Sequence, residues 1–342
     1  MYRFGLTGIP LSSKGRMLRD AIEDTYLMGL NALEITFMKF NVMDVDATVE
    51  VGLKPKEVMP ETKDESKIVI DVLRINEEGN YESVGIDTQI ERGDILRILQ
   101  WNLARSYSEL EDLGKIAKEL DVKLTFHTPN YIDLVSNDEF TEKSINYIIW
   151  SGMLENVLNA DMIVTNLGLY GDNEPANAMK KIIQNVKIVR DRLNKMNIKI
   201  PIGFETSGKK SVAGSLEELL DVSKKVKNVV PIVNFPKLMA RSGMLFKSPQ
   251  DYEKVIQKVE KYFPNGLYVQ FASLETMPEN MIRLAPIKRG EPKFDFLAEL
   301  IYEKEYDITI ISVSPLLEHD AQYMRVILER IISKKIQNKW EK

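Results

Sequence analysis

The chain has 342 residues but no cysteine and only two histidines, His127 and His319. The lack of cysteine excludes disulfides, thiolate metal ligands and cysteine nucleophiles. No stretch approaches the roughly 18 uncharged apolar residues of a membrane-spanning helix, and the N-terminal MYRFGLTGIP lacks the apolar core of a signal peptide. We therefore expect a cytoplasmic protein with no membrane partner. The missing cysteine, the few histidines and the abundant Lys, Glu and Ile point to a thermophilic source.

The charge balance also limits the partners. The net charge is −5, which gives no global attraction to nucleic acid or to an anionic membrane, although a local basic patch remains open. Hydrophobic residues make up 44% of the chain and charged residues 28%. This composition is typical of a globular protein with a sizeable core.

Short apolar runs alternate with amphipathic helical patterns along most of the chain, which predicts an α/β fold. The runs that predict strands are residues 2–9, 32–37, 123–127, 162–167, 202–205, 230–235, 266–272 and 307–313. The helical patterns are residues 14–28, 95–120, 139–158, 175–196, 216 onward, 249–262, 294–302 and 320–336. Eight strand–helix units predict a (β/α)8 TIM barrel that spans residues 1–342 as one domain, with an open doubly wound sheet as the alternative.

Residues 42–93 interrupt this rhythm after the second predicted strand. Their second half predicts a β-hairpin around Glu-Glu-Gly-Asn at 77–80. Because the insertion follows a barrel strand, we expect it over the C-terminal mouth of the barrel. It could act there as a lid or contact a protein partner, or it could be a solvated decoration.

Polar residues follow most of the predicted strands, and in a barrel these positions converge on one cavity. Glu205 is the most prominent, because it ends an apolar strand and precedes the polar loop TSGKK. Asn and Gln are weak zinc ligands and an ammonium group cannot bind a metal, so the set does not predict a zinc site. The strand-end candidates are Ser12, Ser13, His127, Asn166, Glu205, Asn234, Lys237, Gln270, Arg283, Ser312 and Ser314.

Several segments resemble the endonuclease IV branch (AP endonuclease family 2) of the xylose isomerase-like TIM barrels. They are LTFHTPNYIDLVS, which contains His127 and Tyr131, and FETSGKKSVAGSLEEL, RFGLTGIPLS, VNFPKLMARSG and SPLLEHDAQYM. The resemblance runs over nearly the whole chain except residues 42–93. It implies a DNA repair activity, hydrolysis of a phosphodiester at an abasic site by three zinc ions.

The departures from this family pattern change the expectation. His127 and Glu205 occupy two of the family's ligand positions, but Asn166, Asn234, Lys237 and Gln270 stand where His or Asp is expected. A final Glu is replaced by Ser312 or Val313, and an Asp-x-His pair by Ile282 and Leu284. We therefore expect that the trinuclear zinc site is lost and that no cofactor is bound, with a single divalent metal as the open alternative.

The replacements suggest a specific arrangement in place of the metals. We expect the Lys237 ammonium to neutralise the buried Glu205 carboxylate, flanked by Asn166, Asn234 and Gln270, with Tyr131 and Arg283 also in the pocket. An unpaired carboxylate there would cost several kcal/mol or stay protonated.

Three functions follow from this arrangement. The first is a non-hydrolytic binding protein for nucleic acid or a small phosphate or sugar ligand, with a basic rim of Lys209, Lys210, Arg241, Arg283, Lys288 and Arg289. The second is a metal-independent or single-metal isomerase- or epimerase-like enzyme for a sugar or sugar phosphate, with His127, Glu205 and Lys237 as acid–base groups. The third keeps abasic-site hydrolysis through Mg or Mn.

Overall fold

The computed structural model describes residues 1–62, 65–276 and 282–340. Within them, eight parallel strands close a barrel, as the sequence predicted, in the order β1-β16-β13-β12-β10-β8-β7-β2. Most of their side chains are buried, because the sheet is covered by helices outside and filled inside. The strands are β1 (Tyr2–Thr7), β2 (Ala32–Thr36), β7 (Lys123–His127), β8 (Ile163–Thr165), β10 (Ile202–Glu205), β12 (Val229–Asn234), β13 (Leu267–Phe271) and β16 (Ile308–Ser312).

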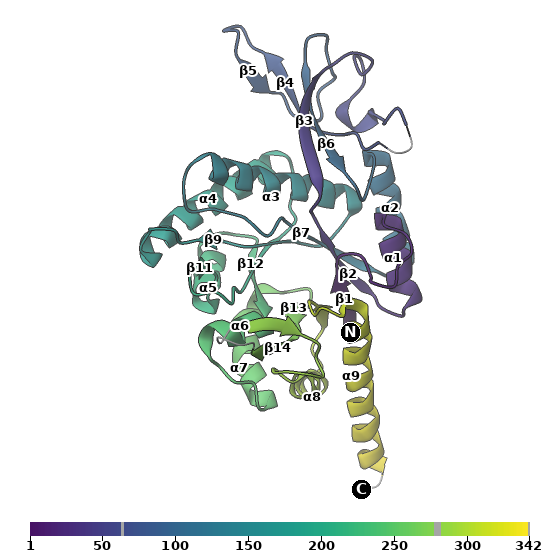
Figure 1. Ribbon diagram of the computed structural model, residues 1–342, viewed down its shortest axis with the longest axis vertical. Helices are drawn as coiled ribbons and strands as arrows, with labels where there is room; N and C mark the ends of the chain where they lie inside the picture. Colours follow the sequence, from purple (N-terminus) through teal and green to yellow (C-terminus); the bar gives the residue numbers. More distant parts are fainter. Residues whose placement is uncertain (63–64, 277–281, 341–342) are drawn as a thin grey trace.

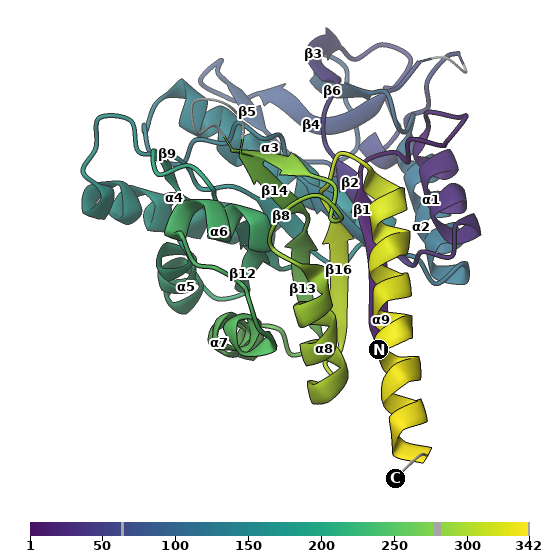
Figure 2. The ribbon, with the colours of Figure 1, turned by 60° about the horizontal axis from the view of Figure 1, so that its bottom comes forward.

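Helices follow the strands and cover the outside of the barrel (Figure 2). Side-chain caps begin several of them: Ser106, Asp138 and Ser215 each accept a hydrogen bond from a backbone N–H of the first turn. The helices are α1 (Leu18–Leu27), α2 (Tyr107–Glu119), α3 (Glu139–Leu158), α4 (Pro175–Lys195), α5 (Leu216–Lys225), α6 (Phe235–Ser242), α7 (Pro249–Val259), α8 (Phe294–Lys304) and α9 (Leu317–Trp340).

The segment between β2 and α2 forms a separate antiparallel sheet in the order β3-β6-β4-β5. A small apolar core, which includes Val69, Val72 and Leu96, stabilises it. Figure 1 shows this sheet projecting from the α2 and α3 side of the barrel. Its strands are β3 (Phe40–Asp46), β4 (Ile68–Ile75), β5 (Tyr81–Ser83) and β6 (Ile95–Trp101), with the 3-10 helix η1 (Pro55–Glu57) between β3 and β4.

Two boundaries predicted from the sequence are therefore wrong. The inserted sheet spans residues 40–101 rather than 42–93, and residues 95–101 form a strand although the pattern predicted a helix from 95. The run ILRILQW has apolar residues at spacings that fit either a helix or a buried strand. The segment forms a strand because it pairs with β3 on one side and with β4 on the other. Helix α2 begins only at Tyr107.

Aromatic side chains join the inserted sheet to the barrel. The ring of Phe37, directly after β2, stacks on Phe40 of β3 with centroids 4.2 Å apart. Trp101 at the end of β6 packs against Phe37 and against Phe126 of β7, at 5.7 and 5.5 Å. The Tyr107 hydroxyl of α2 also donates a hydrogen bond to the Val69 carbonyl at 3.0 Å. The insertion is thus packed onto the carboxyl ends of β2 and β7.

The remaining short elements are two antiparallel pairs beside the barrel. The first pair is β9 (Gly168–Leu169) with β11 (Val212–Ala213), and the second is β14 (Ser273–Thr276) with β15 (Ile282–Ala285). The 3-10 helix η2 (Glu260–Tyr262) follows α7. No helix in the described part of the chain is long and apolar enough to cross a membrane.

The inside of the barrel changes character along its axis. Apolar side chains, including Met162, Val164, Ile232 and Ile311, pack together in its interior. Toward the carboxyl ends of the strands the inward-facing residues become polar, and these are Glu34, His127, Glu205, Asn234 and Gln270, all buried. The fold therefore gathers buried polar groups at one end of the barrel, where α/β barrels carry their functional sites.

We predict that the aromatic junction is important for the stability of the whole fold. Trp101 is 1% exposed, so Trp101→Ala should lower the free energy of unfolding by about 3–5 kcal/mol through lost burial and the cavity left behind. Urea denaturation measures the effect. Tyr81→Ala, on the same sheet but 52% exposed, is the matched control and should cost less than about 1 kcal/mol. Equal effects of the two substitutions would contradict this role of Trp101.

Candidate functional site

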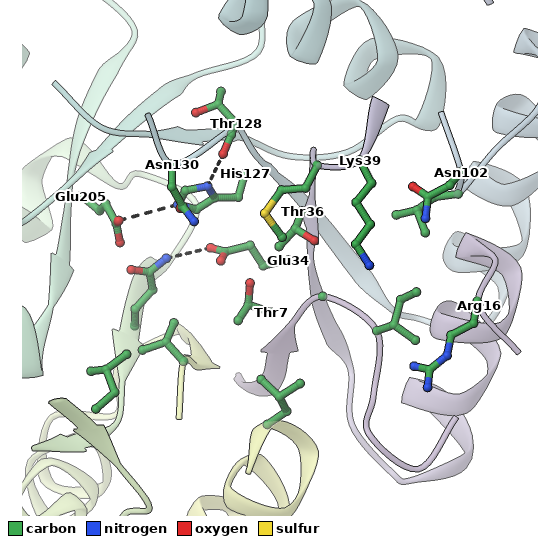
Figure 3. A pocket seen from close by; sticks show the side chains of 18 of the residues that line it. Thr7, Arg16, Glu34, Thr36, Lys39, Asn102, His127, Thr128, Asn130 and Glu205 are labelled. Atoms are coloured by element: carbon green, nitrogen blue, oxygen red, sulfur yellow. Dashed lines mark hydrogen bonds and ion pairs between the residues drawn. The ribbon is translucent and has the colours of Figure 1, made fainter. Parts of the chain in front are cut away.

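A cavity of about 710 Å³ opens at the carboxyl ends of the barrel strands. Its inner wall carries Glu34, His127, Glu205, Lys237 and Gln270. Its outer wall is formed by the β1–α1 loop, the turn after β2 and the segment after β6, which contribute Arg16, Lys39 and Asn102 (Figure 3). The volume lies in the range of small-molecule sites, about 300–1,000 Å³.

Glu205 is the centre of the inner wall. Its side chain is 2% exposed, and one carboxylate oxygen, Oε1, accepts a hydrogen bond from the Lys237 ammonium at 2.5 Å. The same oxygen lies 3.6 Å from His127 Nε2, a distance too long for a good hydrogen bond but short enough for charge attraction. The other oxygen, Oε2, accepts a hydrogen bond from Asn234 Nδ2 at 3.3 Å. Protein donors therefore surround both oxygens.

The local sequence Asn-Phe-Pro-Lys explains how Lys237 reaches Glu205. Asn234 ends β12 and caps α6, because its side-chain oxygen accepts a hydrogen bond from the Lys237 backbone N–H at 3.2 Å. Pro236 suits the first turn of a helix, where its missing N–H costs nothing. A lysine near a helix N-terminus is opposed by the helix dipole. Its ion pair with Glu205 offsets this cost.

The charges of Glu205, Lys237 and His127 support one another. Burial opposes ionisation of Glu205, but the Lys237 ammonium and the nearby His127 outweigh it and lower the pKa of Glu205 to about 2. Burial likewise opposes protonation of His127, but the contact with Glu205 and the charge of Glu34 outweigh it, so the His127 pKa is raised. His127 Nδ1 lies 2.6 Å from the Thr128 carbonyl and must donate to it, which leaves Nε2 for Glu205.

A chain of hydrogen bonds continues from Glu205 across the barrel. Asn234 Nδ2 donates to Gln270 Oε1 at 2.8 Å, and Gln270 Nε2 donates to Glu34 Oε2 at 2.8 Å. The Tyr268 hydroxyl also donates to Glu34 Oε2 at 2.8 Å, and burial together with the Glu34 charge raises the Tyr268 pKa well above its usual value. The two carboxylates, Glu34 and Glu205, are thus linked and oriented by two amide side chains.

The structure brings together five of the residues singled out from the sequence and leaves others apart. His127, Glu205, Asn234, Lys237 and Gln270 meet in the network described above. Of the described residues around the cavity, neither Asn166 nor Tyr131 lines it, and Tyr131 is 79% exposed. Arg283 forms an ion pair with Glu275 across the β14–β15 pair. Val313 rather than Ser312 faces the cavity.

The residues proposed as a basic rim do not line the cavity either. Arg241 is held by its own surroundings: its guanidinium donates hydrogen bonds to the carbonyl groups of Lys209 and Val212 and to the Tyr170 hydroxyl. The Lys288 ammonium lies over the ring of Tyr323, 4.1 Å from its centroid. Lys209, Lys210 and Arg289 are also absent from the described cavity wall.

Sequence reasoning missed three charged residues of the cavity. Glu34 lies within the apolar run ALEITF of β2 and is 1% exposed. An acid inside a buried strand is costly without a partner, and that signal could have identified it. Arg16 and Lys39 lie in the loops that follow β1 and β2. Those loops face the barrel mouth, so their basic residues could have been found by the same rule that found Lys237.

The donor set does not suit a metal cluster. The described residues contain no group of three or more His, Asp or Glu side chains that could hold a metal ion. At Glu205, a cation already sits where a metal would bind, and the neighbouring Asn234 and Gln270 are poor ligands for zinc. The three zinc ions implied by the family resemblance do not fit these side chains, and we derive no chemistry from them.

A closed parallel barrel with a polar cavity at its carboxyl end defines a (β/α)8 barrel with a ligand or active site in the usual place. The chain belongs to the xylose isomerase-like TIM barrel family, whose model matches residues 90–324. This confirms the resemblance identified from the sequence motifs. The match begins within the inserted segment and excludes β1, β2 and most of the inserted sheet.

Individual relatives are distant. An uncharacterized protein of Methanocaldococcus jannaschii is 25% identical over 256 residues, which cover 72% of this chain and 91% of that protein. Endonuclease IV from Thermus thermophilus has a similar structure, with a TM-score of 0.59 and 13% identity over 96% of this chain and 99% of that chain. An L-ribulose 3-epimerase also reaches 0.59, with 10% identity over 98% of both chains. At these identities the structural matches show a shared fold only.

We predict that Glu205 controls the protonation of His127. The pKa of His127 is raised in the folded protein. Protonated His127 therefore stabilises the fold fully below about pH 6.5, the pKa of a histidine in the unfolded chain. This contribution to stability is lost as the pH rises through the pKa of His127 in the folded protein. Glu205→Gln should lower the His127 pKa, because the negative charge that favours the protonated imidazole is removed while burial still opposes protonation. NMR titration of the imidazole Cε1–H measures it.

His319 provides the internal control for this titration, because it is the only other imidazole in the chain and its side chain is 59% exposed. Its signal should behave in the same way in the wild type and in the variant. An unchanged His127 titration in Glu205→Gln would show that the carboxylate does not hold the proton on His127.

Proposed function

We propose that this cavity binds a small polyhydroxylated ligand of the sugar or sugar phosphate class without a metal ion. The observation that carries the proposal is the Lys237–Glu205 ion pair, with 2.5 Å between Nζ and Oε1. A divalent metal on Glu205 would have to displace this ammonium or lie beside it, and like charges at that distance repel strongly in a buried site. The pair therefore takes the electrostatic place that a metal ion would hold.

The polar groups of the cavity suit hydroxyl recognition. Carboxylates accept hydrogen bonds, an ammonium donates them, and amides do both, so Glu34, Lys237 and Gln270 together can match the alternating donors and acceptors of a sugar. Asn102 and Asn130 add amide groups on other parts of the wall. A concave cavity of about 710 Å³ suits a small molecule better than a nucleic acid duplex. The basic rim expected for a nucleic acid is not assembled around it.

Isomerisation or epimerisation of a bound sugar is the second candidate. It is favoured by the position of Glu34, whose bonds from Gln270 and Tyr268 both reach Oε2. A carboxylate fixed in this way, with Lys237 and His127 on the same cavity, could remove a proton next to a sugar carbonyl while a cationic group stabilises the developing oxyanion. Structures with a similar fold include an L-ribulose 3-epimerase and a D-psicose 3-epimerase, which supports testing this chain for the same class of reaction.

Ligand binding can be tested by thermal denaturation of EDTA-treated protein with a panel of pentoses, hexoses and their monophosphates. A ligand present at about 100 times its Kd should add about 2.7 kcal/mol to the free energy of unfolding and raise Tm. Glu34→Gln should weaken binding of the same ligand about tenfold, the loss expected for one hydrogen bond to a charged group. Glu299→Gln, at a half-buried position of α8 outside the described cavity wall, is the charge-matched control.

Three outcomes would contradict the proposal. They are no shift with any sugar, a shift that requires added zinc, and cleavage of duplex DNA at an abasic site that is abolished in Glu205→Gln. The last result would instead establish the retained endonuclease.

Catalysis is separated from binding by proton NMR in D2O. An isomerase or epimerase should exchange the sugar hydrogen next to the carbonyl for deuterium, in the presence of EDTA, and Glu34→Gln should slow this exchange at least 100-fold. A protein that binds the sugar but leaves its C–H signals intact over days is a binding protein.

A further inference from the structure

We propose that Arg16, Lys39 and the amide of Asn102 form a phosphate subsite at the outer end of the cavity, so that the ligand is a sugar monophosphate rather than a free sugar. The subsite lies away from Glu205 and His127, with the Lys39 ammonium and the Arg16 guanidinium on the same side of the cavity (Figure 3). This inference rests on the proposed function and deepens it, because it assigns the charged part of the ligand.

The first argument is the distribution of charge. The inner wall carries two carboxylates, Glu34 and Glu205, together with the Lys237 ammonium and His127, so the acids and the basic groups of this end lie close to each other. Arg16 and Lys39 are the other charged groups of the described cavity wall and add two positive charges at the outer end. In a chain with a net charge of −5, two added cations with no acid beside them on the wall are unusual.

The second argument is that neither cation is used by the fold. In the described part of the chain no carboxylate lies within ion-pair distance of Arg16 or Lys39, whereas Arg3, Arg74, Arg97 and Arg192 all pair with acids. Both side chains are exposed and line the cavity. Two like charges on one wall repel each other, and a bound anion would remove that repulsion.

The backbone of Lys39 supports a dedicated role. Lys39 has a φ of 57°, a left-handed conformation that residues other than Gly and Asn seldom adopt. It lies in the turn between Phe37 and Phe40, whose rings stack on each other at 4.2 Å. The Phe37 N–H also donates to the His127 carbonyl at 2.8 Å. The stacked rings and this hydrogen bond fix the turn, and the turn presents Lys39 to the cavity.

Arg16 is brought to the same place by a contact between two distant segments. The Leu18 N–H donates to the Leu103 carbonyl at 3.0 Å, which joins the start of α1 to the residue after Asn102. The Asp20 carboxylate accepts a hydrogen bond from the Met17 N–H at 3.0 Å and so fixes the chain beside Arg16. Arg16, Lys39 and Asn102 therefore come from three segments that are held together by the fold.

Phosphate fits this set better than a carboxylate. A phosphate monoester carries a charge of about −1.5 to −2 at pH 7 and can be matched by two cations, whereas a carboxylate carries one charge. A guanidinium can bind two phosphate oxygens at once, a lysine supplies a point charge, and an amide N–H can take the remaining oxygen.

The test compares Arg16→Gln/Lys39→Gln with the wild type by isothermal titration calorimetry at low salt, with inorganic phosphate, D-ribose 5-phosphate and D-ribose as probes. We expect inorganic phosphate and D-ribose 5-phosphate to bind the double variant at least tenfold more weakly. D-ribose should bind both proteins within a factor of two. Lys14→Gln is the control, because it removes one positive charge from the same loop at a residue outside the described cavity wall.

The outcomes separate the two proposals. Equal phosphate binding by the double variant and the wild type, or an equally large loss in Lys14→Gln, would overturn the subsite. If D-ribose or another free sugar binds and a phosphate group adds no affinity, the subsite is wrong and the sugar site stands. If neither free sugars nor phosphates bind the wild type, both proposals fail. Tm values measured without ligand show whether the variants are folded.

Discussion

The structure of the site depends on keeping one buried carboxylate ionised. Glu205 ends a central barrel strand with 2% of its side chain exposed, and the desolvation of such a group costs several kcal/mol unless donors replace the lost water. His127 at the end of β7, and Asn234 and Lys237 at the junction of β12 and α6, supply them. Removing any one would leave part of the charge without a partner. The buried carboxylate thus lies among side chains from the end of β7, the end of β12 and the first turn of α6.

The two amides beside this carboxylate have a role that a metal ligand could not fill. Asn234 accepts a hydrogen bond from the α6 backbone and donates from its Nδ2 to both Glu205 and Gln270, and Gln270 passes the interaction on to Glu34. An aspartate at 234 could accept but not donate. The two amide side chains therefore build a connected network between the two carboxylates.

The barrel could be predicted because it follows from strong local signals, whereas the Glu205–Lys237 pair was expected from the family resemblance, in which Lys237 stands at a position where a metal ligand is expected. Apolar runs of four to eight residues define the strands, and the segment VNFPK places a lysine one helical turn after a strand. Residues 95–101 could not be assigned, because the same apolar spacing serves a helix or a strand until pairing partners are known. Glu34, Arg16 and Lys39 carry local signals that mark them as candidates. Their neighbours could not be predicted, because these are distant in sequence, such as Gln270 for Glu34 and Leu103 for the loop of Arg16.

The residues that line the cavity come from two parts of the chain, of which only one matches the family model. His127, Glu205, Lys237 and Gln270 lie within residues 90–324, which match the family model, whereas Arg16, Glu34 and Lys39 lie before that region. The turn that carries Lys39 directly precedes β3, the first strand of the inserted sheet, and Asn102 directly follows β6, its last strand. A change in the insertion would therefore alter the outer wall while the inner network stayed intact. The part of the barrel that matches the family model thus holds Glu205 and its donors, and the N-terminal segments contribute Glu34 to the inner wall and the two cations to the outer wall.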